Sequence, residues 1–170
     1  MILLDMDGVC FDMLGAIKKR NNAFKPEKVE SYDFKQGDYG ISRKEVLKLL
    51  AEPETFSMQS MYGGIYDAVY RLSRLGKTVG YTSVPEDCVD IRRKQIDLLG
   101  VDPCVFIGKK PVITSATVVI DDDPSVLDMY KGMDTKCFLI SHTYNKDYDA
   151  DHVIRVDCVG EAVKILEGSK

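Results

Sequence analysis

The segment Ile2–Val9, with the sequence ILLDMDGV, determines the fold that we expect for this chain. Its apolar start predicts a short buried strand, and its polar residues begin where that strand would end. Gly8 permits a sharp turn at this point because glycine has no Cβ. Further β-rich runs follow at residues 78–81, 104–107, 117–120, 136–140 and 153–156.

Helical patterns lie between these runs. Residues 65–75 place apolar side chains on one helical face, and Gly76 follows as a stop signal. A second helix is predicted from Pro85 to Gly100, and a last one over residues 159–166. This alternation is typical of an α/β fold: a Rossmann-like parallel sheet with helices on both faces.

The interval between the first two predicted strands is too long for one crossover helix. We therefore expect an insert over residues 12–60, with residues 1–11 and 61–170 forming the α/β core. Ser42–Glu45 matches a capping box before an apolar run, and Pro53 is expected to end that helix. These features predict a small helical cap over one end of the sheet. Its basic residues are typical of a solvated helix face or, alternatively, steer a small anion: Lys18, Lys19, Arg20, Lys25 and Lys28.

The composition is that of an ordinary globular chain. Its 170 residues are 45% hydrophobic and 29% charged, which excludes a disordered or collagen-like chain. The net charge of −4 disfavours a stable nucleic-acid partner, because such binding needs many basic residues facing phosphates. No apolar run approaches the ~20 residues of a membrane span. No targeting peptide is visible either, so we expect a cytoplasmic protein with no membrane partner.

The cysteines are odd in number and widely spaced, without a C-x-x-C pair. This pattern fits neither a zinc site nor a disulfide framework. We expect free thiols, buried or half-buried, in a reducing compartment. They are Cys10, Cys88, Cys104, Cys137 and Cys158.

Polar clusters follow four of the predicted strands: Asp5 and Asp7, Thr82 and Ser83, Lys109 and Lys110, and Asp121–Asp123. The carboxyl ends of parallel strands meet at one edge, so these clusters should converge on one cleft. Carboxylates gathered there need a cation, and hard oxygen ligands favour Mg²⁺. A carboxylate beside Mg²⁺ stays ionised and can attack phosphorus, while a lysine and a hydroxyl hold the phosphoryl oxygens. One D-x-D or one Asp pair alone would equally be a turn or a helix cap, but the ordered set predicts a functional acidic site.

The same motifs resemble those of the haloacid dehalogenase superfamily. Asp5–Val9 resembles its first motif, Thr82 its second, Lys110 or Lys109 its third, and Asp121–Asp122 its fourth. More narrowly, Tyr81–Pro85 and Ser115–Asp122 are similar to the 5′(3′)-deoxyribonucleotidases. Those enzymes remove phosphate from deoxynucleoside monophosphates, and the resemblance implies a haloacid dehalogenase-like core with the same reaction here.

The resemblance also implies a role for each motif residue. Asp5 is the nucleophile that forms an aspartyl phosphate, and Asp7 is the general acid and base. The metal ligands for Mg²⁺ are Asp5, the backbone carbonyl of Asp7, Asp122 and, nearby, Asp121. The phosphoryl group is bound by Thr82, Ser83 and Lys110 or Lys109, with Lys110 preferred for its distance from Asp121.

The cap of the related enzymes supplies an apolar, aromatic pocket for the base. The candidates here are equally good candidates for plain cap core: Phe34, Tyr39, Phe56, Met58, Met61 and Tyr62. The family commonly has arginine after the paired aspartates, whereas this chain has Asp123, which either weakens phosphate affinity or caps a helix. The related nucleotidases are often dimers, which suggests a homodimer here.

Other functions remain open from the sequence. One is a phosphatase of another small phosphate monoester or of nucleic-acid 3′-phosphate ends. A non-enzyme alternative is a phospho-receiver-like binding switch, but a receiver carries its acidic pair after the first strand and has no cap of this size. His142 and His152 are expected to be surface or capping residues, and residues 144–151 a solvated polar loop.

Overall fold

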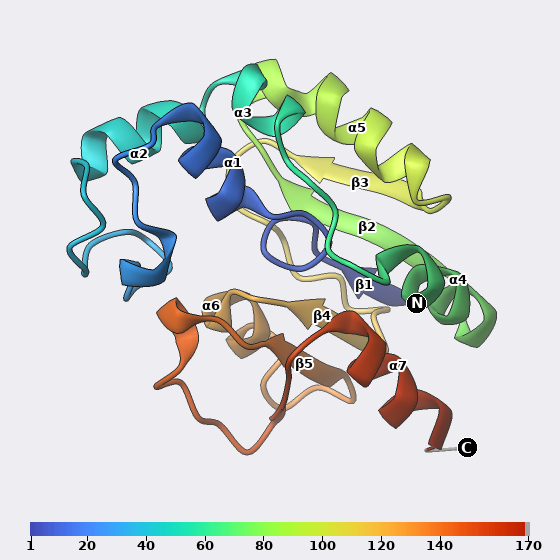
Figure 1. Cartoon of the computed structure of the whole chain (residues 1–170). Helices are drawn as coiled ribbons and strands as arrows, with labels where there is room; N and C mark the ends of the chain where they lie inside the picture. Colours follow the sequence, from blue (N-terminus) through green and yellow to red (C-terminus); the bar gives the residue numbers. More distant parts are fainter. Residues whose placement is uncertain (169–170) are drawn as a thin grey trace.

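The computed structural model describes residues 1–168, and a single six-stranded sheet lies at its centre (Figure 1). Every neighbouring pair of strands is parallel, which confirms the predicted α/β class. The order across the sheet is β3-β2-β1-β4-β5-β6, so the first strand lies near the middle. The strands are β1 (Ile2–Leu4), β2 (Thr78–Ser83), β3 (Asp102–Phe106), β4 (Val118–Asp121), β5 (Lys136–Ile140) and β6 (Val153–Val156).

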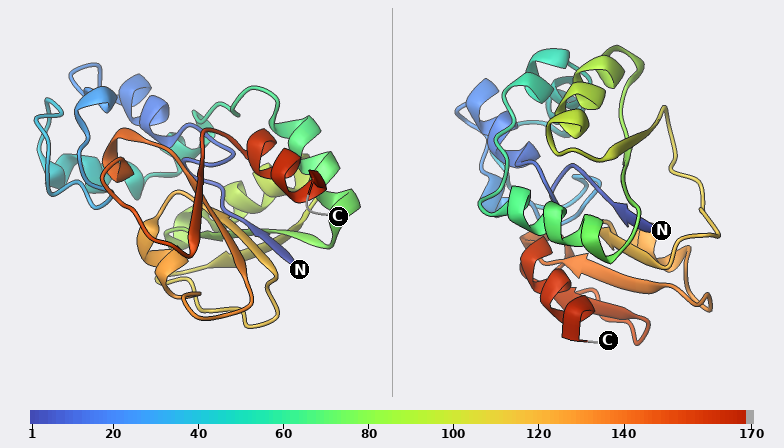
Figure 2. Two further views of the ribbon diagram at one scale, coloured as in Figure 1. Left: turned by 90° about the horizontal axis from the view of Figure 1, so that it is seen from below. Right: turned by 90° about the vertical axis from the view of Figure 1, so that its right-hand side faces the viewer.

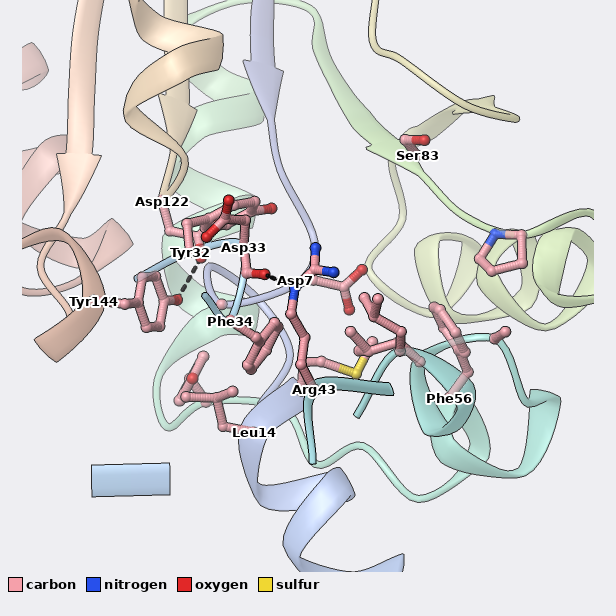
Figure 3. A pocket seen from close by; sticks show the side chains of 17 residues that line it. Asp7, Leu14, Tyr32, Asp33, Phe34, Arg43, Phe56, Ser83, Asp122 and Tyr144 are labelled. Atoms are coloured by element: carbon pink, nitrogen blue, oxygen red, sulfur yellow. Dashed lines mark hydrogen bonds between the residues drawn. The ribbon is translucent and has the colours of Figure 1, made fainter. Parts of the chain in front are cut away.

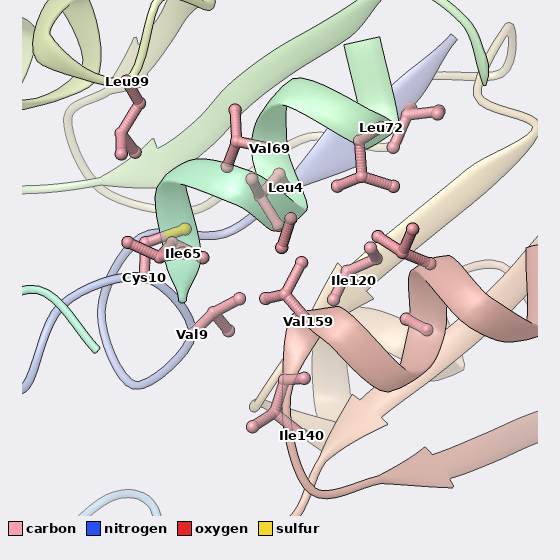
Figure 4. Close-up of a cluster of buried hydrophobic side chains, with 14 of the residues drawn as sticks. Leu4, Val9, Cys10, Ile65, Val69, Leu72, Leu99, Ile120, Ile140 and Val159 are labelled. Atoms are coloured by element: carbon pink, nitrogen blue, oxygen red, sulfur yellow. The ribbon is translucent and has the colours of Figure 1, made fainter. Parts of the chain in front are cut away.

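Helices cover both faces of the sheet, although unequally. One face packs against α4 (Ile65–Leu75), α5 (Val89–Leu98) and α7 (Val159–Gly168), around the buried cluster that includes Leu4 and Ile120 (Figure 4). The neighbouring residues Leu3 and Val119 point to the opposite face, because successive side chains of a strand alternate. That face is covered by the five-residue helix α6 (Pro124–Asp128) and by the residues around Ile113 and Tyr130.

The helix predicted from Pro85 to Gly100 forms as two pieces. A 3₁₀ turn, η2 (Glu86–Cys88), leads into α5, and Gly100 follows in the left-handed region at φ +71°. Gly80 of β2 lies directly beneath α5, where an added Cβ would be 2.7 Å from Cγ2 of Ile96. The glycine therefore lets α5 approach the sheet closely.

Residues 12–60, which we call the insert segment, lie beyond the carboxyl ends of the strands (Figures 1 and 2). The chain leaves and rejoins the core at neighbouring points, because Phe11 and Met61 form an antiparallel bridge. The Asp12 amide also donates to the Ser60 carbonyl at 2.9 Å. The helices of the segment are α1 (Met13–Arg20), η1 (Pro26–Lys28), α2 (Arg43–Leu50) and α3 (Pro53–Ser57).

Half of the capping box predicted in the insert segment forms at α2, where Ser42 Oγ accepts a hydrogen bond from the Glu45 amide at 3.2 Å. The Glu45 carboxylate accepts instead from Nδ2 of Asn21 at 2.6 Å. Pro53 behaves differently from the prediction. The helix α2 has already ended at Leu50, and Pro53 occupies the first turn of α3, a position that tolerates a missing N–H.

The insert segment has its own apolar core, which includes Phe24, Val29 and Val46. Val84 and Cys88 of the α/β core belong to the same cluster, so the segment packs firmly on the start of α5. Three of its basic residues, Lys18, Lys19 and Arg20, make contacts within the segment, consistent with a structural surface. Arg20 pairs with Glu52 at 2.5 Å, and Lys18 and Lys19 donate to backbone carbonyls.

Among residues 1–168, no helix is long and apolar enough to cross a bilayer. All the cysteines are free thiols, as expected. Cys158 differs from the expectation of burial, because it lies exposed just before α7.

Candidate active site

Three carboxylates meet at the carboxyl edge of the sheet. Asp5 directly follows β1, Asp121 ends the neighbouring strand β4, and Asp122 comes next. Carboxylate oxygens of the three residues lie within 4.8 Å of one another, and all three side chains are buried. The sequence motifs at the ends of β1 and β4 are thus brought into one acidic cluster, as adjacent parallel strands require.

Lys110 partly balances this acidic cluster. Its ammonium nitrogen lies 2.6 Å from Oδ1 of Asp5 and 2.8 Å from Oδ2 of Asp121. Burial would lower the pKa of Lys110, but the two carboxylates raise it above its ordinary value, so the side chain stays cationic. Burial, together with the neighbouring Asp121, raises the pKa of Asp5 to about 7, against the opposing effect of Lys110.

The acidic cluster fits a divalent cation. One lysine cannot neutralise three carboxylates, and burial raises the pKa of Asp122 well above its ordinary value. Oδ1 of Asp122 is also buried without a hydrogen-bond partner among the described residues. A buried oxygen without a donor is costly unless a cation meets it. The donor set consists of hard oxygens, which suits Mg²⁺.

Tyr144 is a part of the site that our sequence analysis missed. Its hydroxyl donates to Oδ2 of Asp122 at 2.5 Å, which leaves Oδ1 as the free oxygen (Figure 3). The prediction of a solvated loop is therefore wrong at this residue, because the 3₁₀ turn η3 (Thr143–Asn145) folds its ring inward. Within the sequence, the one clue is that Tyr144 follows β5 at the same edge of the sheet.

His142 supports this arrangement. It precedes η3 and caps it, as expected, and its ring stacks on that of Tyr144 with centroids 4.8 Å apart. Its Nε2 donates to the Gly8 carbonyl at 2.6 Å, and burial lowers the pKa of the ring. His142 therefore ties the first motif to the loop that carries Tyr144.

Gly8 is required here for two reasons. It adopts φ +74°, which is strained for other residues, and its Cα faces the acidic cluster. An added Cβ would lie 2.2 Å from Oδ2 of Asp122 and 2.8 Å from the Tyr144 hydroxyl oxygen. Any larger residue would displace that hydrogen-bonded pair.

A polar cavity of about 560 Å³ opens beside the acidic cluster and is bordered by Asp5, Thr82 and Lys110. Thr82 is buried at the end of β2, and the Ser83 hydroxyl donates to the Gly108 carbonyl. Lys109 borders the cavity but is exposed, whereas Lys110 contacts the carboxylates. The structure thus brings all the phosphate-binding candidates to one cavity and separates the two lysines by position.

Asp7 faces a different set of groups. It borders the polar cavity, but its carboxylate accepts hydrogen bonds from Gln59 and Arg92. Asp123 caps α6 by accepting from the Ser125 amide at 2.9 Å, which was one of the two alternatives expected for it.

A second cavity, of about 480 Å³, lies under the insert segment and has mostly apolar walls (Figure 3). Asp7, Tyr32 and Ser83 border both cavities, so the two adjoin. Three of the aromatic candidates line the second cavity: Phe34, Phe56 and Tyr62. The remaining candidates do not.

Those remaining candidates have structural environments instead. Tyr39 belongs to the core of the insert segment, where its hydroxyl donates to the Phe34 carbonyl at 2.7 Å. Met58 is exposed, and Met61 packs against the main core. Aromatic and sulfur-containing side chains suit a core and a pocket equally well, which is why composition alone did not separate them.

Comparison with known proteins identifies a family. A model described as 5′ nucleotidase, deoxy (pyrimidine), cytosolic type C protein (NT5C) matches residues 1–168. No curated protein matches the chain significantly.

Similar solved structures share the fold. A haloacid dehalogenase-like hydrolase from Burkholderia xenovorans LB400 is 17% identical, with a TM-score of 0.56 over 96% of this chain and 94% of that one. CbbY from Rhodobacter sphaeroides, in complex with phosphate, is 14% identical, with a TM-score of 0.54 over 94% of each chain. A structure described as a dehalogenase is 10% identical, with a TM-score of 0.58 over 96% of this chain and 95% of that one. At these identities the likeness extends to the fold alone.

Proposed function

The chain belongs to the family of 5′ nucleotidases, deoxy (pyrimidine), cytosolic type C, and from this premise we propose that it is a Mg²⁺-dependent phosphatase of deoxynucleoside monophosphates. The proposal further assigns Asp5 as the nucleophile and Asp7 as the general acid and base. Family membership makes the chain a phosphatase. The substrate, the metal and the catalytic residues are inferred from the site.

The observation that carries the proposal is the junction of the two cavities. The polar cavity is bordered by the ammonium group of Lys110 and by the carboxylates of Asp5 and Asp7. The apolar cavity has aromatic walls. A substrate with a phosphate at one end and a flat, weakly polar group at the other would fill both. Volumes of this order are usual for small-molecule sites.

In the first half of the reaction, Asp5 attacks phosphorus with a carboxylate oxygen. Lys110 and Thr82 bind the phosphoryl oxygens, where negative charge is held as the bond to the leaving oxygen breaks. Asp7, in its protonated form, donates its proton to that leaving sugar oxygen. The products of this step are the free nucleoside and an aspartyl phosphate on Asp5.

In the second half, a water molecule attacks the same phosphorus. Asp7 is now ionised and takes the proton of the water, so the residue returns to its starting form. The bond between phosphorus and Asp5 breaks, and inorganic phosphate leaves. Lys110 remains in contact with the Asp5 oxygen and limits its rotation.

The acidic cluster and the Asp7 carbonyl would hold Mg²⁺, which supplies positive charge against the phosphoryl oxygens. Oδ1 of Asp122 is the ligand atom that we assign most directly, because it is buried without another partner in the described chain. Tyr144 occupies the other oxygen of that carboxylate and fixes its rotation.

The base would lie in the apolar cavity, between walls that the insert segment provides. Phe34 and Phe56 come from that segment and Tyr62 from just beyond it. We therefore propose that residues 12–60 act as a cap that selects the substrate. Rings of this kind bind a flat base by stacking and by burial of apolar area.

The test is phosphate release from a substrate panel in the presence of Mg²⁺, beside an Asp5→Asn control. The panel contains 5′ and 3′ deoxynucleotides, ribonucleotides, sugar phosphates and a 3′-phosphorylated oligonucleotide. We expect preference for deoxynucleoside monophosphates. Preference for the oligonucleotide or a sugar phosphate would keep the chemistry and overturn the substrate.

The family description includes the word cytosolic, and we extend a cytoplasmic location to this chain on that basis. A homodimer is likewise proposed by resemblance, and the elution volume of the purified protein in size-exclusion chromatography tests it.

A further inference from the structure

A buried arginine lies behind the proposed general acid. We infer that Arg92 is a positioning residue for Asp7: together with Gln59 it holds Oδ1 of the carboxylate and leaves Oδ2 to transfer the proton. This inference rests on the proposed function, in which Asp7 protonates the leaving oxygen. Among the carboxylates assigned to the reaction, Arg92 contacts Asp7 and not Asp5 in the described chain.

The contacts converge on one oxygen. Nη2 of Arg92 donates to Oδ1 of Asp7 at 2.5 Å, and Nε2 of Gln59 donates to the same atom at 2.6 Å. Within residues 1–168, both donors that reach this carboxylate use Oδ1. An oxygen that accepts two hydrogen bonds, one of them from a cation, is a poor site for a proton. The proton therefore resides on Oδ2 when Asp7 acts as an acid.

Asp7 is the only anionic partner of Arg92 among the described residues. The Arg92 side chain is fully buried on α5, with 0% exposure. Nε and Nη1 have no hydrogen-bond partner there. A buried guanidinium is costly without a counter-ion, so a structural arginine would be expected to satisfy more of its donors.

Two aromatic rings hold the guanidinium in place. Its central carbon lies 5.3 Å from the centroid of the Phe11 ring and 5.0 Å from that of Phe56. Such contacts are attractive, because the faces of aromatic rings carry negative charge. Phe11 lies where the chain leaves the core, and Phe56 belongs to the insert segment. Arg92 is thus clamped at the boundary between the two.

Gln59 connects Asp7 to the insert segment. It lies at the end of that segment, and Gln95 of α5 donates to its side-chain oxygen at 3.5 Å. Gln95 also donates to the Phe56 carbonyl at 2.8 Å. Arg92 and Gln95 are three residues apart and so share one helical face. That face of α5 fixes Asp7 and the end of the insert segment together.

The experiment compares two substrates that differ in their need for an acid. A deoxynucleoside monophosphate has an alkyl leaving oxygen that must be protonated, whereas p-nitrophenyl phosphate releases a stable phenolate. The parameter is kcat/KM, which covers the steps up to release of the leaving group. The variants are Arg92→Met, Arg92→Lys, Gln59→Leu and Asp7→Asn. The control is Arg93→Met, which changes the neighbouring, exposed arginine of the same helix.

We expect Arg92→Met to lower kcat/KM by about tenfold or more on the nucleotide, and by no more than the ~10²–10⁴-fold that a general acid–base group contributes. The loss on p-nitrophenyl phosphate should be several times smaller, Arg92→Lys should recover part of the difference, and Arg93→Met should change neither value. Gln59→Leu should also lose more kcat/KM on the nucleotide than on p-nitrophenyl phosphate, although the difference should be smaller. This variant keeps the test available if Arg92→Met fails to fold. Adding Arg92→Met to Asp7→Asn should cause little further loss, since both act through one carboxylate.

Equal losses on the two substrates in Arg92→Met and Gln59→Leu, beside a selective loss in Asp7→Asn, would overturn the positioning role and leave the proposed function standing. If Asp7→Asn itself lost equal activity on the two substrates, Asp7 would not be the general acid, and the positioning role of Arg92 would be refuted with it. Loss of all hydrolysis in Asp5→Asn, measured in the same series, tests the phosphatase chemistry separately from either result.

Discussion

Asp5 and Asp7 are the same residue type, two positions apart, and they occupy opposite environments. Asp5 lies among carboxylates that outnumber the one lysine beside them, and burial raises its pKa to about 7. Asp7 lies against a buried arginine and a glutamine amide, so its charge is matched. The acidic cluster lacks positive charge, whereas the Asp7–Arg92 pair does not. The difference shows that neighbours, and not the motif alone, give one aspartate a site short of positive charge and the other a matched ion pair.

The two environments also differ in what they do for stability. Crowded carboxylates destabilise the folded chain until a cation binds, which is a common cost of a functional site. A buried ion pair is different, because removing one partner leaves the other without compensation. Substitutions at the two positions should therefore separate activity from stability.

The largest effect should come from Asp5→Asn. We expect phosphate release to fall by about 10⁴-fold or more, because the attacking group is lost. The metal-free variant should be at least as stable as the wild type, since it carries one carboxylate fewer in the acidic cluster. Steady-state phosphate release with Mg²⁺ and Tm in chelator measure the two quantities. Near-normal hydrolysis would refute the nucleophile assignment.

Asp7→Asn should instead destabilise the fold. It leaves Arg92 buried without an anion. Breaking a buried ion pair in this way lowers the free energy of unfolding by up to about 3–5 kcal/mol. Arg92→Met should cost less, because the carboxylate that it strands keeps 22% side-chain exposure. The double variant should recover part of the loss of Asp7→Asn. Urea unfolding of the three variants tests this order, and equal stability of Asp5→Asn and Asp7→Asn would contradict the difference between the two environments.

Tyr144→Phe should weaken the cation site without removing a ligand. The hydroxyl orients Asp122, and groups of this kind are typically worth about 10–100-fold in metal affinity. The Mg²⁺ concentration at half-maximal activity should rise accordingly, as should the concentration that produces half of the Mg²⁺-induced rise in Tm. Tyr148→Phe is the matched control, because that hydroxyl bonds to Asp128 instead. An unchanged Mg²⁺ requirement in Tyr144→Phe would exclude the orienting role.

A further effect concerns pH in the absence of metal. The unfolded chain ionises Asp5 near its ordinary pKa of 3.8, and the folded chain near about 7. The folded state binds more protons between these values, so stability should fall as pH rises from about 4 to about 7. Mg²⁺ should reverse the trend, since it binds the ionised carboxylates. Tm measured against pH, with and without Mg²⁺, checks the sign, and a rise in metal-free stability through this range would contradict it.

The strand-end residues were predictable because each follows a local pattern. An apolar run predicts a buried strand, and the polar residue after it must lie at the edge of the sheet. That logic placed Asp5, Thr82, Lys110 and Asp122 near one another without any knowledge of packing. The parallel sheet and the helices were accessible for the same reason.

Arg92 and Tyr144 were not predictable, because their roles arise from packing between distant segments. Arg92 lies in the charged run Arg92–Lys94, which is typical of an exposed helix face, and charged residues are rarely fully buried. Tyr144 stands in a loop rich in aspartate. Nothing local distinguishes either residue from a solvated neighbour.

The bridge between Phe11 and Met61 makes the insert segment a module on a narrow stem. A chimera that exchanged residues 12–60 for another cap would keep the hydrogen bonds of the sheet intact. It would, however, uncover Val84 and Cys88 and remove both Gln59 and the Phe56 ring beside Arg92. A transplanted cap must therefore supply its own apolar underside and its own support for the Asp7–Arg92 pair. Substrate specificity can thus be exchanged in this fold only with caps that meet both requirements.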